Sequence, residues 1–127
     1  MKTYVGTKII QASPESKGPL PHGEEGYAVI YEDGYRSWSP KAVFEAAYIE
    51  IGDVSGLPPH QQRVVAERAQ LDDKREKLHA FMNGNSFFAV CDESERMRMH
   101  AQANAMARYS EALESRIAAF TQVGATV

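Results

Sequence analysis

The sequence predicts an α+β protein, in which a small N-terminal antiparallel β module with one short helix precedes a long antiparallel α-helical hairpin. Residues 1–57 hold short β-branched and aromatic runs separated by glycine and proline, which is typical of strands and turns. Residues 58–127 hold two long stretches with helical periodicity. The dipeptide Asn83-Gly84 divides these stretches and indicates a helix end. We therefore expect two domains, 1–57 and 58–127.

Composition narrows the class of protein. The net charge of −3 disfavours a binder of polymeric nucleic acid, and no apolar run reaches the roughly 18 residues of a membrane span. The first residues lack the apolar core of a signal peptide. A single cysteine, Cys91, excludes an internal disulfide. We expect a cytoplasmic protein with no membrane partner.

Three strands are expected in the β module. Residues 2–11 are rich in β-branched and aromatic side chains and predict the first strand, which a loop over 12–26 follows. Residues 27–31 and 35–38 predict a hairpin around Asp33-Gly34.

One short helix should complete this module. Ser39 is the expected N-cap, and Pro40 is suited to the first turn of a helix that ends near Tyr48. Trp38 is expected to pack the strands against this helix. The predicted core consists of Tyr4, Ile9, Val29, Tyr31, Trp38 and Phe44.

The hairpin is expected to contain helices over 60–82 and 92–120. Pro58-Pro59 precedes the first helix, whose thin apolar stripe includes Val64. Asp92 is the expected cap of the second helix, with Glu95 as its capping-box partner, and Gly124 marks the end. At steps of three and four residues, the apolar seam of the second helix is Met99, Gln102, Met106, Tyr109, Leu113, Arg116 and Phe120.

Gln102 and Arg116 interrupt this predicted seam. A buried arginine needs a partner, because its desolvation costs several kcal/mol, roughly. The partner is either a carboxylate on a neighbouring helix or an anionic ligand, and the sequence leaves both open. The seam is also longer than one hairpin covers, so we expect oligomerisation.

Motifs of catalysis are sparse. The sequence lacks a glycine-rich phosphate loop, a paired-histidine zinc motif and a nucleophile elbow, so no catalytic residue, metal site or cofactor is predicted. Asp72-Asp73 fits a solvated helix face better than a metal site. Arg63 either pairs with Glu67 or contacts an anion. Phe87-Phe88 is either a plug at the helix corner or a platform on which bases stack.

The residues nevertheless resemble known families. Residues 2–12 and 26–40 resemble a small bacteriophage module. The second half, through residues 60–65, 71–81 and several positions of the last helix, resembles the helical hairpin shared by two phage counter-defence families. These are the first Thoeris anti-defence protein and the second anti-CBASS protein, and the N-terminal β module is similar to that of the Thoeris family.

The resemblance implies a sponge that binds immune second messengers without degrading them, in the cytoplasm of the infected bacterial host. The implied ligands are glycocyclic ADP-ribose and cyclic trinucleotides, and the implied assembly is a hexamer with sites at subunit boundaries. Guanidinium groups suit the phosphates, and aromatic faces suit adenine. The candidate ligand-binding residues are Arg63, Arg116, Phe88, Asn85, Phe87, Gln102 and Tyr109.

Two other classes of function remain open from the sequence. A phage structural or regulatory protein would use the hairpin to bind another protein. An enzyme that degrades cyclic nucleotides is less favoured, because phosphodiester hydrolysis normally uses metal ligands or clustered histidines.

Overall fold

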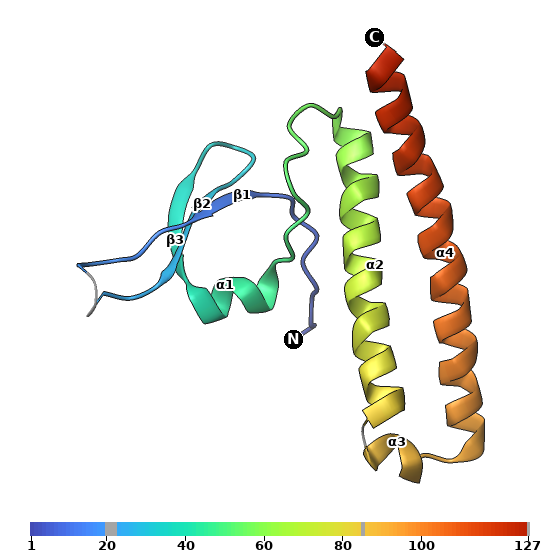
Figure 1. Cartoon of the computed structure of the whole chain (residues 1–127). Helices are drawn as coiled ribbons and strands as arrows, with labels where there is room; N and C mark the ends of the chain where they lie inside the picture. The colour runs from blue at the N-terminus through green and yellow to red at the C-terminus, as the bar shows by residue number, and fades with distance from the viewer. Residues whose placement is uncertain (20–22, 85, 127) are drawn as a thin grey trace. The chain divides into compact units, whose positions relative to one another are not determined.

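The computed structural model describes residues 1–19, 23–84 and 86–126, and the side chains of these residues except 87 and 121–126. The chain divides into two compact units, Met1–Ile49 and Glu50–Val127. A three-stranded sheet and a short helix form the first unit, and two long helices dominate the second (Figure 1). The predicted α+β class is confirmed.

The sheet of the first unit is antiparallel, with the order β1-β2-β3. Its strands are β1 (Gln11–Pro14), β2 (Gly26–Ile30) and β3 (Arg36–Pro40). The predicted turn between β2 and β3 is present: Gly34 has a φ of 87°, and the Asp33 carboxylate accepts a hydrogen bond from the Tyr35 N–H at 3.0 Å. A local signal therefore placed this hairpin correctly.

Helix α1 (Lys41–Ala47) packs on one face of this sheet. The Phe44 ring stacks between Tyr27 and Tyr48, with centroid distances of 4.2 and 5.0 Å. The Tyr27 hydroxyl donates a hydrogen bond to Glu45 at 2.7 Å. Val29, which is 2% exposed, lies on the same face as Tyr27 because alternate residues of a strand share a face.

Trp38 lies on the other face of the sheet, so the prediction that it packs the strands against the short helix was wrong. In the register Trp38 stands opposite Ala28, whereas Tyr27 stands opposite Ser39. Paired residues share a face, which puts the indole on the side away from Tyr27 and α1. There the indole N–H donates to the Glu15 carbonyl at 2.9 Å, and Trp38 is only half-buried.

The predicted strand over residues 2–11 was also wrong. Residues 1–10 have no strand pairing, and Tyr4, expected in the core, is 86% exposed. The physical reason is that residues 1–10 have no partner strand among the described residues. β1 pairs with β2 only from Gln11, which stands opposite Ile30, and the chain turns after Ile30, where β2 ends. Strand propensity without a neighbouring strand does not form a ladder.

Three smaller predictions in this unit need correction. Residues 12–14 of β1 were expected to be loop, and only Gln11 lay in the predicted first strand. The N-cap of α1 is Pro40 rather than Ser39, and no side chain caps this helix. Ile9, Tyr31 and Phe44 of the expected core are half-buried rather than buried.

The second unit is an antiparallel hairpin of α2 (Pro59–Gly84) and α4 (Glu93–Thr126), joined through the short helix α3 (Ser86–Val90). The Asp92 carboxylate accepts a hydrogen bond from the Glu95 N–H at 2.8 Å, which confirms the predicted cap. Helix α4 continues past Gly124, so this glycine does not end it. None of the helices described combines the length and apolarity required to cross a membrane.

The side chains that α4 turns toward α2 are not the ones predicted. Ala103, Ser110 and Leu113 are buried, whereas Gln102 and Arg116 are exposed and Tyr109 is 45% exposed. From Met99, the observed seam advances by four and three residues in turn. It therefore contains Ala103, Ser110 and Ile117, each of which follows a predicted position (Gln102, Tyr109 and Arg116) by one residue. Small residues at 103 and 110 allow the two backbones to approach closely, which Gln102 and Tyr109 would prevent. The seam of α4 is Met99, Ala103, Met106, Ser110, Leu113, Ile117 and Phe120.

Candidate functional site

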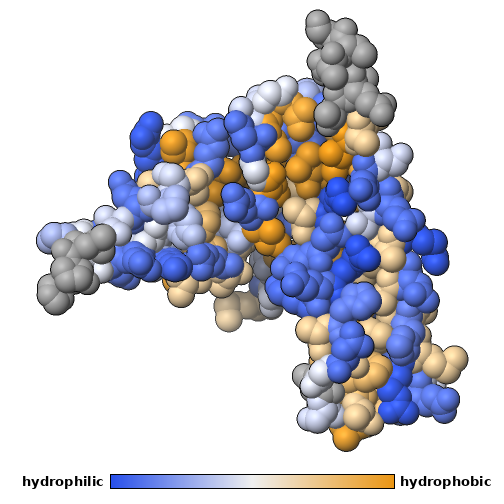
Figure 2. Space-filling view, in the orientation of Figure 1, coloured by the Kyte–Doolittle hydropathy of each residue, from blue (hydrophilic) through white to orange (hydrophobic). Residues whose placement is uncertain are grey.

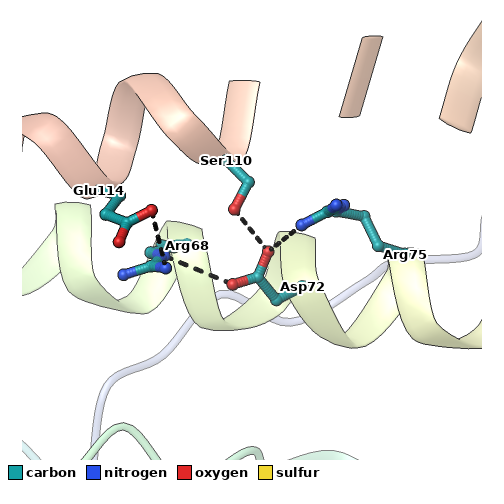
Figure 3. Close-up of polar contacts among 5 residues, drawn as sticks. All are labelled: Arg68, Asp72, Arg75, Ser110 and Glu114. Atoms are coloured by element: carbon teal, nitrogen blue, oxygen red, sulfur yellow. Dashed lines mark hydrogen bonds and ion pairs between the residues drawn. The ribbon is translucent and has the colours of Figure 1, made fainter. Parts of the chain in front are cut away.

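A polar cluster crosses the middle of the hairpin. We call it the Asp72 cluster; from α2 it contains Arg68, Asp72 and Arg75, and from α4 it contains Ser110 and Glu114 (Figure 3). Arg68 and Arg75 each follow an apolar seam residue of α2 by four positions, so both lie in the seam of that helix.

Asp72 is the centre of this cluster. Its carboxylate accepts a hydrogen bond from the Ser110 hydroxyl at 2.7 Å, across the hairpin, and another from Arg75 at 3.2 Å. The Arg68 Nε lies 3.4 Å from the other carboxylate oxygen. Arg68 also reaches α4, where its Nη2 lies 3.5 Å from Glu114. The cluster therefore ties the two helices together in one register.

The electrostatics of the cluster follow from these contacts. The hydrogen bond from Ser110 lowers the pKa of Asp72; partial burial opposes this, and the Arg75 and Arg68 guanidiniums add to the lowering. The Nε atoms of Arg68 and Arg75 are buried, and neither finds a hydrogen-bond acceptor among the described residues. Arg68 is thus held by its ion pairs with Asp72 and Glu114, whereas Arg75 also donates a hydrogen bond to Asp72 through Nη1.

Sequence reasoning missed this cluster, although a signal was present. Arg68 and Arg75 are seven residues apart, in step with Val64 and Leu71, which is the repeat of a seam position. The carboxylate alternative, one of the two left open for a seam arginine, describes these two arginines of α2. It is wrong for Arg116, which is exposed on α4.

Arg63 and Arg116 lie toward the same end of the hairpin. The register that joins Ser110 to Asp72, and Glu114 to Arg68, places Arg116 level with residue 66. Arg63 lies three residues before residue 66, toward the start of α2, which is a distance of about 4.5 Å along the helix axis. Both side chains are exposed, and neither makes an ion pair within the described part of the chain. The alternative Arg63–Glu67 pair is not formed there.

Aromatic residues gather at the opposite end, around α3. The Phe88 ring makes edge-on contacts with Phe81 of α2 and His100 of α4, at centroid distances of 6.0 and 6.1 Å. Apolar residues are visible at this end of the hairpin in Figure 2. An open hollow of about 600 Å³ lies beside them, lined by Lys77, Ala80, Phe81, Gly84 and Ser86. Phe88 therefore serves at least as a plug at the helix corner.

The other predicted site residues are distributed as follows. Asn85 and the side chain of Phe87 lie outside the described residues. Gln102, Tyr109 and Arg116 follow one another at intervals of seven, so they form a single exposed row along α4. The structure brings Arg116 into line with Gln102 and Tyr109. Gln102 is two residues from His100, which contacts Phe88, so the row runs from near the α3 end to Arg116 toward the opposite end.

Asp73, beside the cluster, pairs with Lys77 on the same helix at 2.8 Å. Asp73 forms a helix pair whereas Asp72 turns toward α4, and both side chains are half-buried, so the predicted solvated face at Asp72-Asp73 is not fully solvated. Arginine guanidiniums are suited to binding anions such as phosphates through paired N–H donors. Among the described residues, Arg63 and Arg116 form no ion pair, whereas exposed Arg98 pairs with Glu95 and the seam arginines contact carboxylates.

Comparison with known proteins bears on the hairpin alone. No curated protein and no solved structure gives a significant match. The Sequestin family model matches residues 58–119, which cover α2, α3 and most of α4. The match agrees with the resemblance of these residues to phage anti-defence hairpins. The helical hairpin of this chain, over residues 58–119, therefore belongs to the Sequestin family.

Proposed function

We propose that the protein is a phage anti-defence sponge, which sequesters cyclic nucleotide immune signals in the infected host cell and leaves them chemically intact. The proposed signals are glycocyclic ADP-ribose and cyclic trinucleotides, and the proposed assembly is a homo-oligomer, up to a hexamer. The single observation that carries the proposal is the match of the two-helix hairpin to the Sequestin family.

The exposed arginines give the proposal a physical basis. Arg63 and Arg116 lie toward one end of the hairpin without carboxylate partners among the described residues. A polyanionic ring needs donors of this kind, and guanidinium groups bind phosphates through two parallel hydrogen bonds. We assign Arg63 and Arg116 to the phosphates of a cyclic trinucleotide at a boundary between subunits.

The row of Gln102, Tyr109 and Arg116 supports a subunit boundary. Tyr109 is 45% exposed on the isolated chain, and tyrosine and arginine are residue types that protein interfaces favour. In the proposal, Gln102 and Tyr109 contact a second copy and help to place Arg116 toward the shared ligand.

A second kind of site is assigned to the α3 end. Phe88 and the neighbouring hollow offer an aromatic ring beside open space. We assign adenine of the ADP-ribose isomer to this end, with Phe88 and Phe87 stacking and Asn85 donating or accepting hydrogen bonds. This site and the arginine site would act independently, because they lie toward opposite ends of the hairpin.

The proposal is tested by titration calorimetry of the wild type, Arg63→Ala and Arg116→Ala with each ligand class. Losing a charge-assisted hydrogen bond costs about 1.5–3 kcal/mol, so each variant should bind a cyclic trinucleotide roughly ten- to a hundredfold more weakly. Arg108→Ala is the matched control, because Arg108 is another exposed arginine of α4. Light scattering must show that every variant keeps the wild-type assembly.

Three results would count against parts of this proposal. Equal affinity of all four proteins would remove the arginines from the site. Absence of binding to either ligand class by the wild type would favour the alternative, a hairpin that binds another protein. Ligand recovered in a cleaved form after heat denaturation of the complex would indicate an enzyme, whereas a sponge releases it intact.

A further inference from the structure

The hollow beside α3 has a cation in its wall. It is lined by Lys77, Ala80, Phe81 and Gly84 of α2 and by Ser86 of α3. The four residues of α2 are spaced by three, one and three positions, which places them on a single face of the helix. Among the described lining residues, Lys77 alone is charged, and none is acidic. The hollow is therefore suited to a ligand that carries negative charge.

Open space separates this cation from the aromatic residues. Ala80 is exposed, and a Cβ at Gly84 would meet no described residue within 4 Å beyond its own stretch of helix. The Phe81 ring meets the Phe88 ring edge-on, with a centroid distance of 6.0 Å. Lys77 precedes Phe81 by four residues, which is about 6 Å along the helix axis. A cation and an aromatic group at this spacing match the two parts of a nucleotide, in which one sugar separates the phosphate from the base.

The polarity of α2 determines which way round a nucleotide would lie. The last carbonyl groups of a helix carry partial negative charge, which disfavours an anion beside Gly84, where α2 ends. Lys77 lies seven residues earlier, about two turns from that end. The phosphate is therefore favoured beside Lys77, and the uncharged base is favoured beside Gly84 and Phe88.

The ammonium group of Lys77 already has a partner, but the contact is weak. It lies 2.8 Å from a carboxylate oxygen of Asp73, one turn earlier on the same helix. The Lys77 side chain is 75% exposed, and ion pairs of this kind contribute little because water competes with them. A phosphate group that enters the hollow can therefore displace Asp73 from the ammonium at small cost.

We infer that Lys77 binds the pyrophosphate of the ADP-ribose isomer, and that Asp73 competes with this ligand for the ammonium group. The inference rests on the proposed function, which assigns the adenine of this ligand to the α3 end. Lys77 adds a charged contact there, whereas Arg63 and Arg116 lie toward the other end of the hairpin. A lysine binds phosphate as a point charge, so it needs no second donor in a fixed geometry.

The inference is tested by titration calorimetry of the full-length protein with glycocyclic ADP-ribose. Lys77→Gln keeps a helix-forming residue and should bind this ligand roughly five- to tenfold more weakly, with an affinity that falls less steeply as salt is added. Lys74→Gln, the matched control, replaces an exposed lysine of α2 outside the described lining and should change the affinity less than about twofold. Asp73→Asn should bind about twofold more tightly, because it releases the ammonium.

The outcomes separate this inference from the proposed function. Circular dichroism and light scattering must first show that each variant keeps the fold and the assembly. If the wild type binds glycocyclic ADP-ribose and Lys77→Gln binds it as well as Lys74→Gln does, the inference is overturned and the proposed function stands. Absence of binding by the wild type would overturn both.

Two further results would also overturn the role of Lys77. Equal weakening by Asp73→Asn and Lys77→Gln would show that the ion pair between these residues acts only through structure. An equal loss of affinity by Lys77→Gln for a cyclic trinucleotide would indicate a general effect of charge, because the arginine site lies toward the opposite end of the hairpin. We expect the trinucleotide affinity of Lys77→Gln to equal that of the wild type.

Discussion

The hydrogen bond from Ser110 to Asp72 offers the sharpest test of how the hairpin is held together. Ser110 is 4% exposed and lies 2.7 Å from a carboxylate of the facing helix. Ser110→Ala removes this donor and changes little else. A hydrogen bond to a charged group contributes about 1.5–3 kcal/mol, and alanine returns up to about 0.5 kcal/mol of helix propensity.

Partial exposure reduces the expected effect. The Asp72 side chain is 40% exposed, so water replaces part of the lost contact. We therefore expect Ser110→Ala to lower the free energy of unfolding by about 1–2 kcal/mol at neutral pH. The measurement is urea denaturation followed by circular dichroism, at one protein concentration, because assembly shifts apparent stability. Ser115→Ala, at an exposed position of the same helix, is the control and should cost nothing.

The pH dependence separates this explanation from a simple packing effect. The pKa of Asp72 is lowered from 3.8 in the folded protein, first by Ser110. A carboxyl group with a lowered folded pKa contributes stability that is present above its unfolded pKa and is lost as the pH falls through the folded value. The difference between wild type and Ser110→Ala should thus be full above about pH 5 and shrink below pH 3.8. A difference that stays constant down to pH 2, or that equals the Ser115→Ala control, would refute the reasoning.

Two further substitutions probe local features. Asp92→Ala removes the cap bond to the Glu95 N–H and should lower the free energy of unfolding by about 1 kcal/mol, measured in the same urea assay; an unchanged midpoint would mean that the cap is redundant. Gly26→Ala would bring a Cβ against the Ser39 carbonyl and the Trp38 ring, so we expect destabilisation of the β module by about 1–3 kcal/mol, followed by tryptophan fluorescence. Gly6→Ala, in open space, should leave that transition in place.

Local signals in the sequence predicted the parts of the fold that depend on a few neighbouring residues. The turn at Asp33-Gly34 and the cap at Asp92 are set by side-chain and backbone chemistry within three or four positions. The predicted strand over residues 2–11 failed because strand propensity alone does not form a ladder, and residues 2–10 pair with no strand among the described residues. The prediction for Trp38 failed because the pairing register, and not the hydrophobicity of the side chain, decides the face of the sheet on which Trp38 lies.

The seam of α4 shows why helix phase is harder to predict than helix position. Rows that contain Tyr109 or Ser110 both satisfy steps of three and four residues. Hydrophobicity favoured the row with the larger side chain, whereas close packing of two backbones favours the small one. Which row of α4 packs against α2 depends on the facing surface of α2. The charged residues of that surface cannot be inferred from the sequence of α4 alone.

The corrected phase also changes what the arginines imply for function. The sequence left one question for a seam arginine, namely whether a carboxylate or an anionic ligand satisfies it. In the hairpin, the seam arginines and the exposed arginine have different partners. Arg68 and Arg75 lie in the seam and contact Asp72 and Glu114, so they are suited to fixing the register of the helices. Arg116 lies on the exposed row, where it costs no desolvation until a partner covers it, and that makes it better suited to an anion at a subunit boundary than a seam arginine would be.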